Sequence, residues 1–529
     1  MTGFFRGSAV FQVISLFSWG RCLRYGCRRL DYDVRFYFVF RSGCGAFLLA
    51  SFGFGVFSFR PESPIAVASS PHGSGGLLTR INTPVTEGLR HDREKGEVKN
   101  EPLGFDPYLV GWIGDDDPEN PRNWSFAKRA FTTFSISFLA FSVYIGSAIY
   151  TPAIPGLMEA YDISLAKATV GLTLYILAYG VGPMFFSPLQ ELPILGRNPV
   201  YIGTLFIFVL FQLPIAIAKN FSTVLAFRFL TGFFGSPALA TGGASLGDIW
   251  PMHQLAYVIG LWALGGVAGR LTVGIIQGGF PAQANGWRWP IYELIWISGF
   301  ALVFLALFLP ETYEPTILLR RAERLRKLTG NPNLRSQSEI DAASTTASDR
   351  LYEALVRPFI LAAEPALLFS NTYLGFVYAV FYLWFEAFPL VFTDIYHFNL
   401  GESGLPFLGF IISGAIAYTA YCLYQKYYIT PLYVKTGGAV PPEIRLEIGL
   451  MASIFIPTSI LIFGFTSKTD IHWIAPVIGA ALYLPGLFLI FQSILMYITM
   501  AYPSHAASVL AGNGLFRSAF ACCFPQVYL

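Results

Sequence analysis

Long apolar runs, separated by short polar segments, fill most of the chain after residue 129. The hydrophobic residues in each run are nearly continuous, whereas in a surface helix of a soluble protein they would follow one face. An α-helix rises about 1.5 Å per residue, so about 20 apolar residues cross a hydrocarbon layer of roughly 30 Å. The pattern predicts membrane spans at 130–151, 167–187, 199–218, 222–245, 255–279, 290–310, 367–391, 404–424, 446–465, 473–497 and 506–525.

A polar linker divides the predicted spans into six before it and five after it. We therefore expect an N-terminal six-helix half at 129–312, a cytoplasmic linker at 313–358 and an incomplete C-terminal half at 359–529. The expected fold class is all-α, a polytopic membrane protein of two six-helix halves with about 11 spans present. Transporters built from two such bundles bind their substrate near the middle of the membrane, between the halves.

The two ends of the chain do not follow this plan. Residues 1–70 are rich in Phe, Arg and Cys, lack lysine and contain an apolar run, Cys44–Phe59, that is short for a span. An extra membrane segment, an interfacial segment and a gene-model artefact remain open for them. Residues 71–128 are polar and mixed in charge, which predicts a disordered cytoplasmic lead-in. The last apolar run leaves no room for a twelfth span before Leu529, which favours truncation at the C-terminus.

Composition supports a membrane protein and argues against several other classes. Hydrophobic residues make up 54% of the chain and charged residues 13%, whereas a soluble domain carries about 25% charged residues. The formal net charge of +3 predicts no nucleic-acid partner. The cysteines and histidines show no metal-ligand spacing, and no nucleotide-binding loop or activated nucleophile is evident. We therefore expect no metal, no cofactor, no catalytic residue and no enzymatic activity.

Positive residues indicate which ends of the spans face the cytoplasm. Lys128, Arg129, Arg197 and the linker cluster from Arg320 to Lys327 lie on one side of the membrane if the N-terminus is inside the cell. The loops on the other side carry only scattered lysines. Because cytoplasmic loops are enriched in Lys and Arg, we expect a cytoplasmic N-terminus.

Four short motifs resemble one family of membrane proteins. They are Asp116–Trp124 before the first span, Tyr150–Pro152 at its end, Pro310–Tyr313 after the sixth span and Pro441–Leu446 before the ninth. Together they resemble the fungal drug:proton antiporters of the major facilitator superfamily, the twelve-span group that includes azole, benomyl and polyamine resistance transporters.

The resemblance covers about residues 111–525 and implies the fold and the function. It implies proton-coupled efflux of small amphipathic compounds by alternating access, with the lipid bilayer, the substrate and protons as partners. It further implies a monomer in the plasma membrane. A transport-deficient protein from a truncated or degraded gene, and a proton-coupled importer of the same fold, stay open as alternatives.

Two charged residues inside predicted spans are candidates for proton coupling. Glu386 lies among aromatic residues in the seventh span, where removal from water favours a protonated carboxyl. It is a candidate proton carrier, or else a hydrated carboxyl near the outer interface. Arg228 lies in a sequence that resembles the family's fourth-span arginine motif, which is tied to proton coupling. The alternative is an arginine that extends to the external end of its helix.

The loop between the second and third spans resembles the superfamily's cytoplasmic signature. In that family an acid and an arginine there bridge helices on the inner side and hold the outward-facing state. The matching residues are Glu191 and Arg197, and Asp248 at the inner end of the fourth span is a possible partner of Arg197. The spacing is longer than the family's pattern, so a solvated cluster at the helix ends is the alternative.

The fifth span departs from the family, which carries a glycine- and proline-rich motif there. The glycines that permit close helix packing are Gly265, Gly269, Gly274, Gly278 and Gly279. The prolines are absent, and Arg270 lies in the middle of the span, where it needs an acid or a water-filled cavity. Arg270 would favour anionic substrates or else indicate a degraded protein.

The last predicted span carries a polar pair. Asn513 and Arg517 match the family pattern Asn-x-x-Phe-Arg, although Gly514 occupies a position where an acid is usual. We expect Asn513 and Arg517 to line the cavity between the halves.

Overall fold

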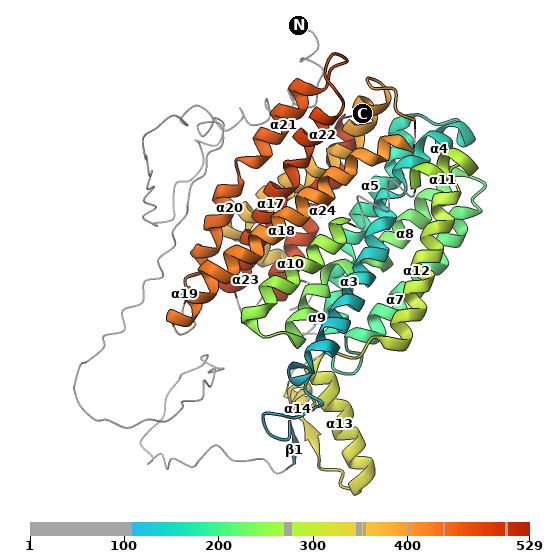
Figure 1. Cartoon of the computed structure of the whole chain (residues 1–529). Helices are drawn as coiled ribbons and strands as arrows, with labels where there is room; N and C mark the ends of the chain where they lie inside the picture. The colour runs from blue at the N-terminus through green and yellow to red at the C-terminus, as the bar shows by residue number, and fades with distance from the viewer. Residues whose placement is uncertain are drawn as a thin grey trace, which may run out of the picture. The chain divides into compact units, whose positions relative to one another are not determined.

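The computed structural model of the chain (Figure 1) describes a defined set of residues. These are 108–268, 278–344, 352, 356–399, 401–436, 440–502 and 506–528. The expectations for residues 1–70, for the lead-in before residue 108 and for Gly269, Arg270 and Gly274 fall outside them.

The N-terminal half consists of helices joined by short turns. They are α3 (Phe126–Ala148), η2 (Thr151–Ala153), α4 (Ile154–Tyr161), α5 (Leu165–Val181), α6 (Pro183–Gln190), α7 (Arg197–Ala216), α8 (Phe221–Ala240), α9 (Gly242–Ile249), α10 (Met252–Ala268), α11 (Gly278–Asn285) and α12 (Trp289–Phe308). Proline begins several of the shorter pieces because it lacks the N–H that would continue the preceding turn. Pro152 thus follows α3, and Pro183 begins α6 where α5 ends.

The C-terminal half repeats this construction. Its helices are α16 (Arg357–Ala362), α17 (Pro365–Phe388), η4 (Pro389–Thr393), η5 (Glu402–Phe407), α18 (Leu408–Tyr424), η6 (Gln425–Ile429), α19 (Thr430–Lys435), η7 (Pro442–Arg445), α20 (Leu446–Ala452), α21 (Phe455–Thr466), α22 (Ile474–Ala481), α23 (Tyr483–Ala501) and α24 (Ala506–Tyr528). The elements η4 and η6 are π-helical and continue α17 and α18. The all-α class predicted from the sequence is confirmed.

Nine helical segments among the described residues are long and apolar enough to cross a membrane. Each coincides with one of the predicted spans. The other two predictions, 255–279 and 506–525, coincide with the shorter apolar helices Gln254–Val267 and Val509–Phe524. Each predicted apolar run therefore coincides with an apolar helix among the described residues.

The two halves contact each other mainly through two pairs of helices, with smaller contacts of α24 with α6 and α8 and of α11 with η5. α5 packs against α24, and α10 packs against α18. At the first contact a side chain on Gly180 would overlap Ser518, so the glycine permits the close approach of the two helices. At the second, the Tyr418 hydroxyl donates to the carbonyl oxygen of Tyr257 at 3.2 Å. The contacts thus combine small residues with hydrogen bonds across the boundary.

The linker and the described part of the lead-in form a small folded unit outside the apolar helices. The lead-in strand β1 (Leu109–Val110) pairs in parallel with β2 (Arg335–Ser336), and the linker holds helices α13 (Glu314–Thr329) and α14 (Gln337–Ser344). The sequence predicted a disordered lead-in up to residue 128. For residues 108–128 this prediction was wrong, because their polar side chains bond to the linker.

Asp117 forms the centre of this unit. Its carboxylate accepts hydrogen bonds from the backbone N–H of Ile113 at 2.8 Å and of Glu119 at 2.9 Å, and pairs with Arg321 at 2.6 Å. The backbone hydrogen bond from Ile113, with the contacts to Arg321 and Glu119, lowers the pKa of Asp117 to about 2. Glu119 pairs in turn with Arg324 at 2.9 Å. The motif Asp116–Trp124 therefore docks the lead-in onto α13.

Candidate functional site

The first two membrane helices are joined by a tyrosine that crosses from one to the other. Tyr150, at the end of α3, lies over Gly171 of α5 and donates its hydroxyl hydrogen to the carbonyl oxygen of Ala168 at 2.9 Å. A Cβ on Gly171 would overlap that hydroxyl. The glycine therefore provides the room that the tyrosine occupies.

The reverse contact has the same form. Tyr175 of α5 lies over Gly146 of α3 and donates to the carbonyl oxygen of Val143 at 2.8 Å. The order and spacing of the three positions are the same in both helices. The antiparallel helices α3 and α5 therefore exchange equivalent contacts, which we call the glycine–tyrosine lock.

Arg228 of α8 lies in the middle of this lock. Its guanidinium carbon is 4.5 Å from the ring centre of Tyr150 and 4.4 Å from that of Tyr175. It donates to the carbonyl oxygens of Gly146 at 2.7 Å and Gly171 at 3.3 Å. Tyrosine rings and carbonyl oxygens both attract a cation, so they replace the water that the buried guanidinium has lost.

Two features of Arg228 bear on the roles expected for it. Its side chain is 0% exposed, so it does not extend to the membrane surface. Among the described residues it pairs with no carboxylate, and its Nη2 atom has no hydrogen-bond partner. Among the described residues, therefore, no ion pair supports the proton-coupling role that the resemblance implies for Arg228.

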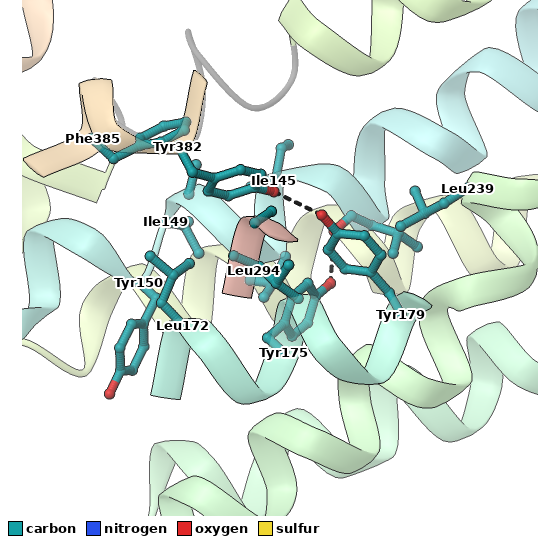
Figure 2. Close-up of a cluster of buried hydrophobic side chains, with 14 of the residues drawn as sticks. Ile145, Ile149, Tyr150, Leu172, Tyr175, Tyr179, Leu239, Leu294, Tyr382 and Phe385 are labelled. Atoms are coloured by element: carbon teal, nitrogen blue, oxygen red, sulfur yellow. Dashed lines mark hydrogen bonds between the residues drawn. The ribbon is translucent and has the colours of Figure 1, made fainter. Parts of the chain in front are cut away.

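The halves meet at a layer of tyrosine hydroxyls. Figure 2 shows Tyr382 of α17 pointing toward Tyr179 of α5, with a distance of 2.9 Å between the hydroxyl oxygens. The Tyr179 hydroxyl also lies 3.1 Å from that of Tyr378. Sequence reasoning missed these residues. The signal was a pair of tyrosines one turn apart in each of two otherwise apolar spans.

Arg517 and Asn513 of α24 lie beside this layer. The guanidinium of Arg517 is 5.4 Å from the ring centres of Tyr378 and of Phe491. Asn513 donates through Nδ2 to Oδ1 of Asn371 on α17 at 2.9 Å. The Nε of Arg517 and the Oδ1 of Asn513 are buried without a hydrogen-bond partner in the described chain.

Glu386 lies on α17 close to the same boundary. Its Oε1 atom is buried and bonds to no group among the described residues. It follows Phe385, whose ring lies 5.5 Å from that of Tyr382. Glu386 is thus a carboxyl group inside a membrane helix, one residue beyond a ring that contacts the tyrosine layer.

The packing of α17 against its neighbours in the C-terminal half is largely aromatic. The ring centres of Phe388 and Phe407 are 4.2 Å apart, and those of Trp384 and Phe463 are 4.8 Å apart. These four residues come from three elements: Phe388 and Trp384 from α17, Phe407 from η5 and Phe463 from α21. Dispersion and burial of ring surface, not directed hydrogen bonds, hold this region.

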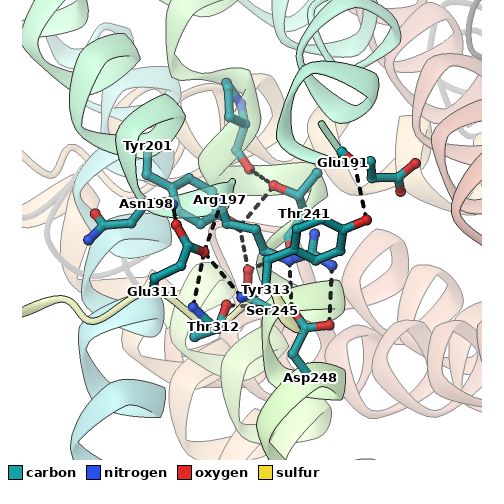
Figure 3. A network of polar contacts seen from close by, with 11 residues as sticks. Glu191, Arg197, Asn198, Tyr201, Thr241, Ser245, Asp248, Glu311, Thr312 and Tyr313 are labelled. Atoms are coloured by element: carbon teal, nitrogen blue, oxygen red, sulfur yellow. Dashed lines mark hydrogen bonds and ion pairs between the residues drawn. The ribbon is translucent and has the colours of Figure 1, made fainter. Parts of the chain in front are cut away.

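At the end of the helices nearest the linker, two of the three predicted gating residues meet. Arg197, at the start of α7, donates through Nε to the Asp248 carboxylate of α9 at 2.6 Å and through Nη2 at 3.3 Å (Figure 3). Glu191 does not take part. Figure 3 shows its carboxylate pointing away from Arg197, and only its backbone carbonyl accepts a bond, from the Tyr313 hydroxyl at 3.1 Å.

A different acid, Glu311, occupies the centre of this network. Its carboxylate accepts from the backbone N–H of Arg197 at 3.1 Å and of Asn198 at 3.2 Å, at the beginning of α7. It also accepts from the N–H of Thr312 and of Tyr313. Acids are favoured at helix N-termini because the first N–H groups lack partners. The motif Pro310–Tyr313 contained this residue, but sequence reasoning gave it no role.

The glycines of the fifth span differ in their surroundings. A Cβ on Gly265 would meet no atom closer than 3.9 Å, whereas one on the neighbouring Gly266 would lie 2.8 Å from the ring of Tyr144. Gly279 is buried, and Gly278 begins α11. The close contact of this motif in the described chain is thus at Gly266, which the sequence analysis did not select.

No cluster of three or more His, Cys, Asp or Glu side chains suited to a metal ion occurs among the described residues. The charged groups near the boundary of the halves are instead single residues on separate helices, Arg228 on α8, Glu386 on α17 and Arg517 on α24. Their arrangement suits recognition of a small molecule and movement of a proton.

Comparison with known proteins identifies relatives over most of the chain. Residues 136–525 match the profile of the Major Facilitator Superfamily. The chain is 42% identical to "Transporter mfs1" of Schizosaccharomyces pombe, with 82% of this chain and 81% of that protein covered. It is 40% identical to "Cycloheximide resistance protein" of Candida maltosa, covering 82% and 79%. It is 38% identical to "Fluconazole resistance protein 1" of Saccharomyces cerevisiae, covering 79% and 76%.

A solved structure shares the fold. The proton:xylose symporter XylE, bound to 6-bromo-6-deoxy-D-glucose, aligns with a TM-score of 0.50 at 13% identity, over 76% of this chain and 90% of that one. At this identity the likeness concerns the fold alone. It places the two predicted halves within a known architecture of membrane helices.

Proposed function

This chain belongs to the major facilitator superfamily, and on that premise we propose that it exports small amphipathic molecules from fungal cells in exchange for protons. The proposal rests on the similarity to resistance transporters, which extends through both halves of the chain. Proteins of this build alternate access by rocking the halves around a shared site. The tyrosine layer between α5 and α17 lies where such a site is expected.

Glu386 is the proposed proton carrier. It is an intramembrane carboxyl group beside the boundary of the halves, and its Oε1 is buried without a partner in the described chain. The neutral form is stable in such surroundings, and the charged form becomes stable when water reaches the group. Alternating exposure to the two sides of the membrane would therefore let Glu386 take up and release one proton in each cycle.

The pair Arg197–Asp248 is the proposed cytoplasmic gate, with Glu311 as the residue that fixes its position. The Glu311 carboxylate binds the N–H groups that begin α7, which places Arg197 against Asp248. Glu191 is a candidate contact to the other half in a second state, because its carboxylate is not engaged by Arg197 here. Neutralising Asp248 should alter the balance of the two states more than neutralising Glu191.

The proposed location is the plasma membrane, with a cytoplasmic N-terminus and a monomeric protein. The folded unit of Asp117 and α13 supports this orientation, because its arginines belong to the positively charged side. Accessibility of single cysteines introduced into α13 would test the orientation. Native mass measurement in detergent would test the oligomeric state.

The decisive experiment is efflux of fluconazole and of cycloheximide from yeast that lacks its own exporters, with and without a proton uncoupler. We expect efflux that the uncoupler stops, and loss of its pH dependence in Glu386→Gln. Glu293→Gln is the matched variant, because Glu293 is a second intramembrane carboxyl group, on α12, whose Oε2 is also buried and unpaired. Unchanged pH dependence in Glu386→Gln, with loss in Glu293→Gln, would transfer the role to Glu293. Uptake in place of efflux would refute export.

A further inference from the structure

Two arginines, Arg228 fully buried and Arg517 half-buried, lie on opposite sides of the boundary between the halves. Arg228 belongs to α8 in the N-terminal half, and Arg517 belongs to α24 in the C-terminal half. Neither pairs with a carboxylate among the described residues. Each guanidinium instead faces aromatic rings, Tyr150 and Tyr175 for Arg228, and Tyr378 and Phe491 for Arg517.

A continuous series of tyrosines joins these two cations. From Arg228 the contacts run to Tyr175 at 4.4 Å, from the Tyr175 ring to that of Tyr179 at 6.1 Å, and from the Tyr179 hydroxyl to that of Tyr378 at 3.1 Å. The Tyr378 ring then faces the guanidinium of Arg517 at 5.4 Å. The boundary therefore carries two positive charges, with phenol groups between them.

Several polar atoms on α24 and α23, the contacting helices that carry Arg517 and its ring neighbour Phe491, lack a partner among the described residues. They are the Nε of Arg517, the Oδ1 of Asn513 and the Oε1 of Gln492, and Asn513 and Gln492 are 1% and 2% exposed. Buried polar groups in proteins are nearly always hydrogen-bonded, so each exception requires an explanation. A bound molecule that accepts from a guanidinium would satisfy the donor among them. Its own hydroxyl or amide hydrogens would satisfy the two acceptors.

We propose that the substrate is an amphipathic organic anion whose carboxylate, or equivalent delocalised anion, binds Arg517 between the halves. This inference rests on the proposed export function and names the charge class of the substrate. The anion accepts from Arg517, and the hydroxyls of Tyr378 and Tyr382 exchange their mutual contacts with Tyr179 for contacts to the ligand. The apolar body of the substrate lies against the neighbouring rings, such as Phe491.

Electrostatics favours this class over the opposite one. A cationic substrate would meet the positive charges of Arg517, which is half-buried, and of Arg228, which is fully buried. Juxtaposed like charges are strongly unfavourable where water is excluded. The carboxyl group of Glu386 offsets one of them at most, and none when it carries a proton. A planar guanidinium is also the side chain that best matches a carboxylate, because it offers two parallel N–H donors.

The test compares two dyes with the same three-ring xanthene core and opposite charge. Fluorescein is anionic and rhodamine 6G is cationic, and their transport is measured in proteoliposomes under an imposed proton gradient. We expect the wild-type protein to transport fluorescein with the larger kcat/KM. Arg517→Gln should lower the value for fluorescein by about 10- to 100-fold, the effect of one charge-assisted hydrogen bond, and leave that for rhodamine 6G unchanged or higher. Arg517→Lys should retain part of the preference.

The control is Arg445→Gln, which removes an arginine from η7 that bonds to Gln425 at 2.9 Å, away from the tyrosine layer. It should leave the ratio of the two dyes unchanged. Equal losses for both dyes in Arg517→Gln would make Arg517 a structural residue and overturn the inference. If Arg517→Gln does not fold, the inference is tested by the ratio of kcat/KM for the two dyes in the wild-type protein and in Tyr378→Phe.

The same assay separates this inference from export itself. Rhodamine 6G transported in preference to fluorescein would overturn the anion proposal and leave proton-driven export standing. Resistance to cycloheximide or fluconazole without transport of fluorescein would have the same meaning. If no dye and no drug is moved under any gradient, the export function fails, and the substrate class fails with it.

Discussion

The two halves of this transporter fill the region beside their boundary with different chemistry. In the N-terminal half, Arg228 and the glycine–tyrosine lock hold α3, α5 and α8 together through hydrogen bonds to carbonyl oxygens. In the C-terminal half, rings such as Phe388 and Phe407 fill the equivalent space by surface contact. A hydrogen bond is lost when its donor or acceptor is displaced, whereas aromatic packing tolerates a substitution that keeps the buried side-chain volume. We therefore expect the N-terminal half to be the less tolerant of the two.

The largest loss of stability, and so the strongest test of this difference between the halves, should come from Arg228→Lys. A lysine keeps the charge but cannot bridge the carbonyl oxygens of Gly146 and Gly171, because it lacks the planar fork of donors. The variant should lose about 3 kcal/mol of stability, since each charge-assisted hydrogen bond contributes about 1.5–3 kcal/mol. Unfolding in mild detergent, followed by tryptophan fluorescence, measures this loss. A change below about 1 kcal/mol would show that the lock does not depend on Arg228.

Gly171→Ala should have the next largest effect. The added methyl group would overlap the Tyr150 hydroxyl, and such overpacking costs about 1–3 kcal/mol. The double variant with Tyr150→Leu should recover part of the loss. Gly299→Ala on α12 is the matched control, because no atom lies within 4 Å of its added Cβ, and it should stabilise the helix by up to about 1 kcal/mol. Equal effects at both glycines would contradict the lock.

A smaller effect is expected from Phe388→Leu in the C-terminal half. Leucine keeps most of the buried apolar volume, so the loss should stay near 1.5 kcal/mol or below, and efflux should persist. Thermal unfolding and drug resistance in yeast would be measured together. If this variant is less stable than Arg228→Lys, the proposed difference between the halves is reversed.

The smallest effect should come from Asp117→Asn, outside the membrane. It should release the lead-in from α13, seen as faster proteolysis near residue 120, while membrane-core stability is unchanged. The pKa of Asp117 is lowered from 3.8 to about 2, so its contribution is complete above pH 4 and is lost as the pH falls toward 2. Wild-type protection should therefore persist at pH 5. Loss of protection between pH 7 and pH 5 would assign it to another group.

The sequence was sufficient for the membrane helices but not for the contacts between them. Hydrocarbon imposes a run of about 20 apolar residues on each span, and this requirement is visible one segment at a time. The partners of Arg228 are backbone carbonyl oxygens of α3 and α5. Because every residue has a carbonyl group, no pattern of side chains predicts such partners. The sequence suggested an acid as the partner of Arg228, and the described residues supply none.

The gating and boundary residues show the same limit in two other ways. Arg197 and Asp248 were paired correctly because opposite charges at helix ends attract each other. Glu191 was selected over Glu311 because a short motif was matched by position, whereas the fold brings the end of α12 to the start of α7. Tyr179 and Tyr382 are over two hundred residues apart in a chain of 529, so only the assembled halves bring them together.

The bond between Asp117 and Arg321 has a consequence for the chain as a whole. It connects the polypeptide just ahead of the first membrane helix to the polypeptide just beyond the sixth, so the two ends of the N-terminal half are held together outside the membrane helices. Division of the chain after Ser344 would leave this connection intact. Two separately synthesised pieces, divided at this position, should then find each other in the bilayer and restore drug resistance.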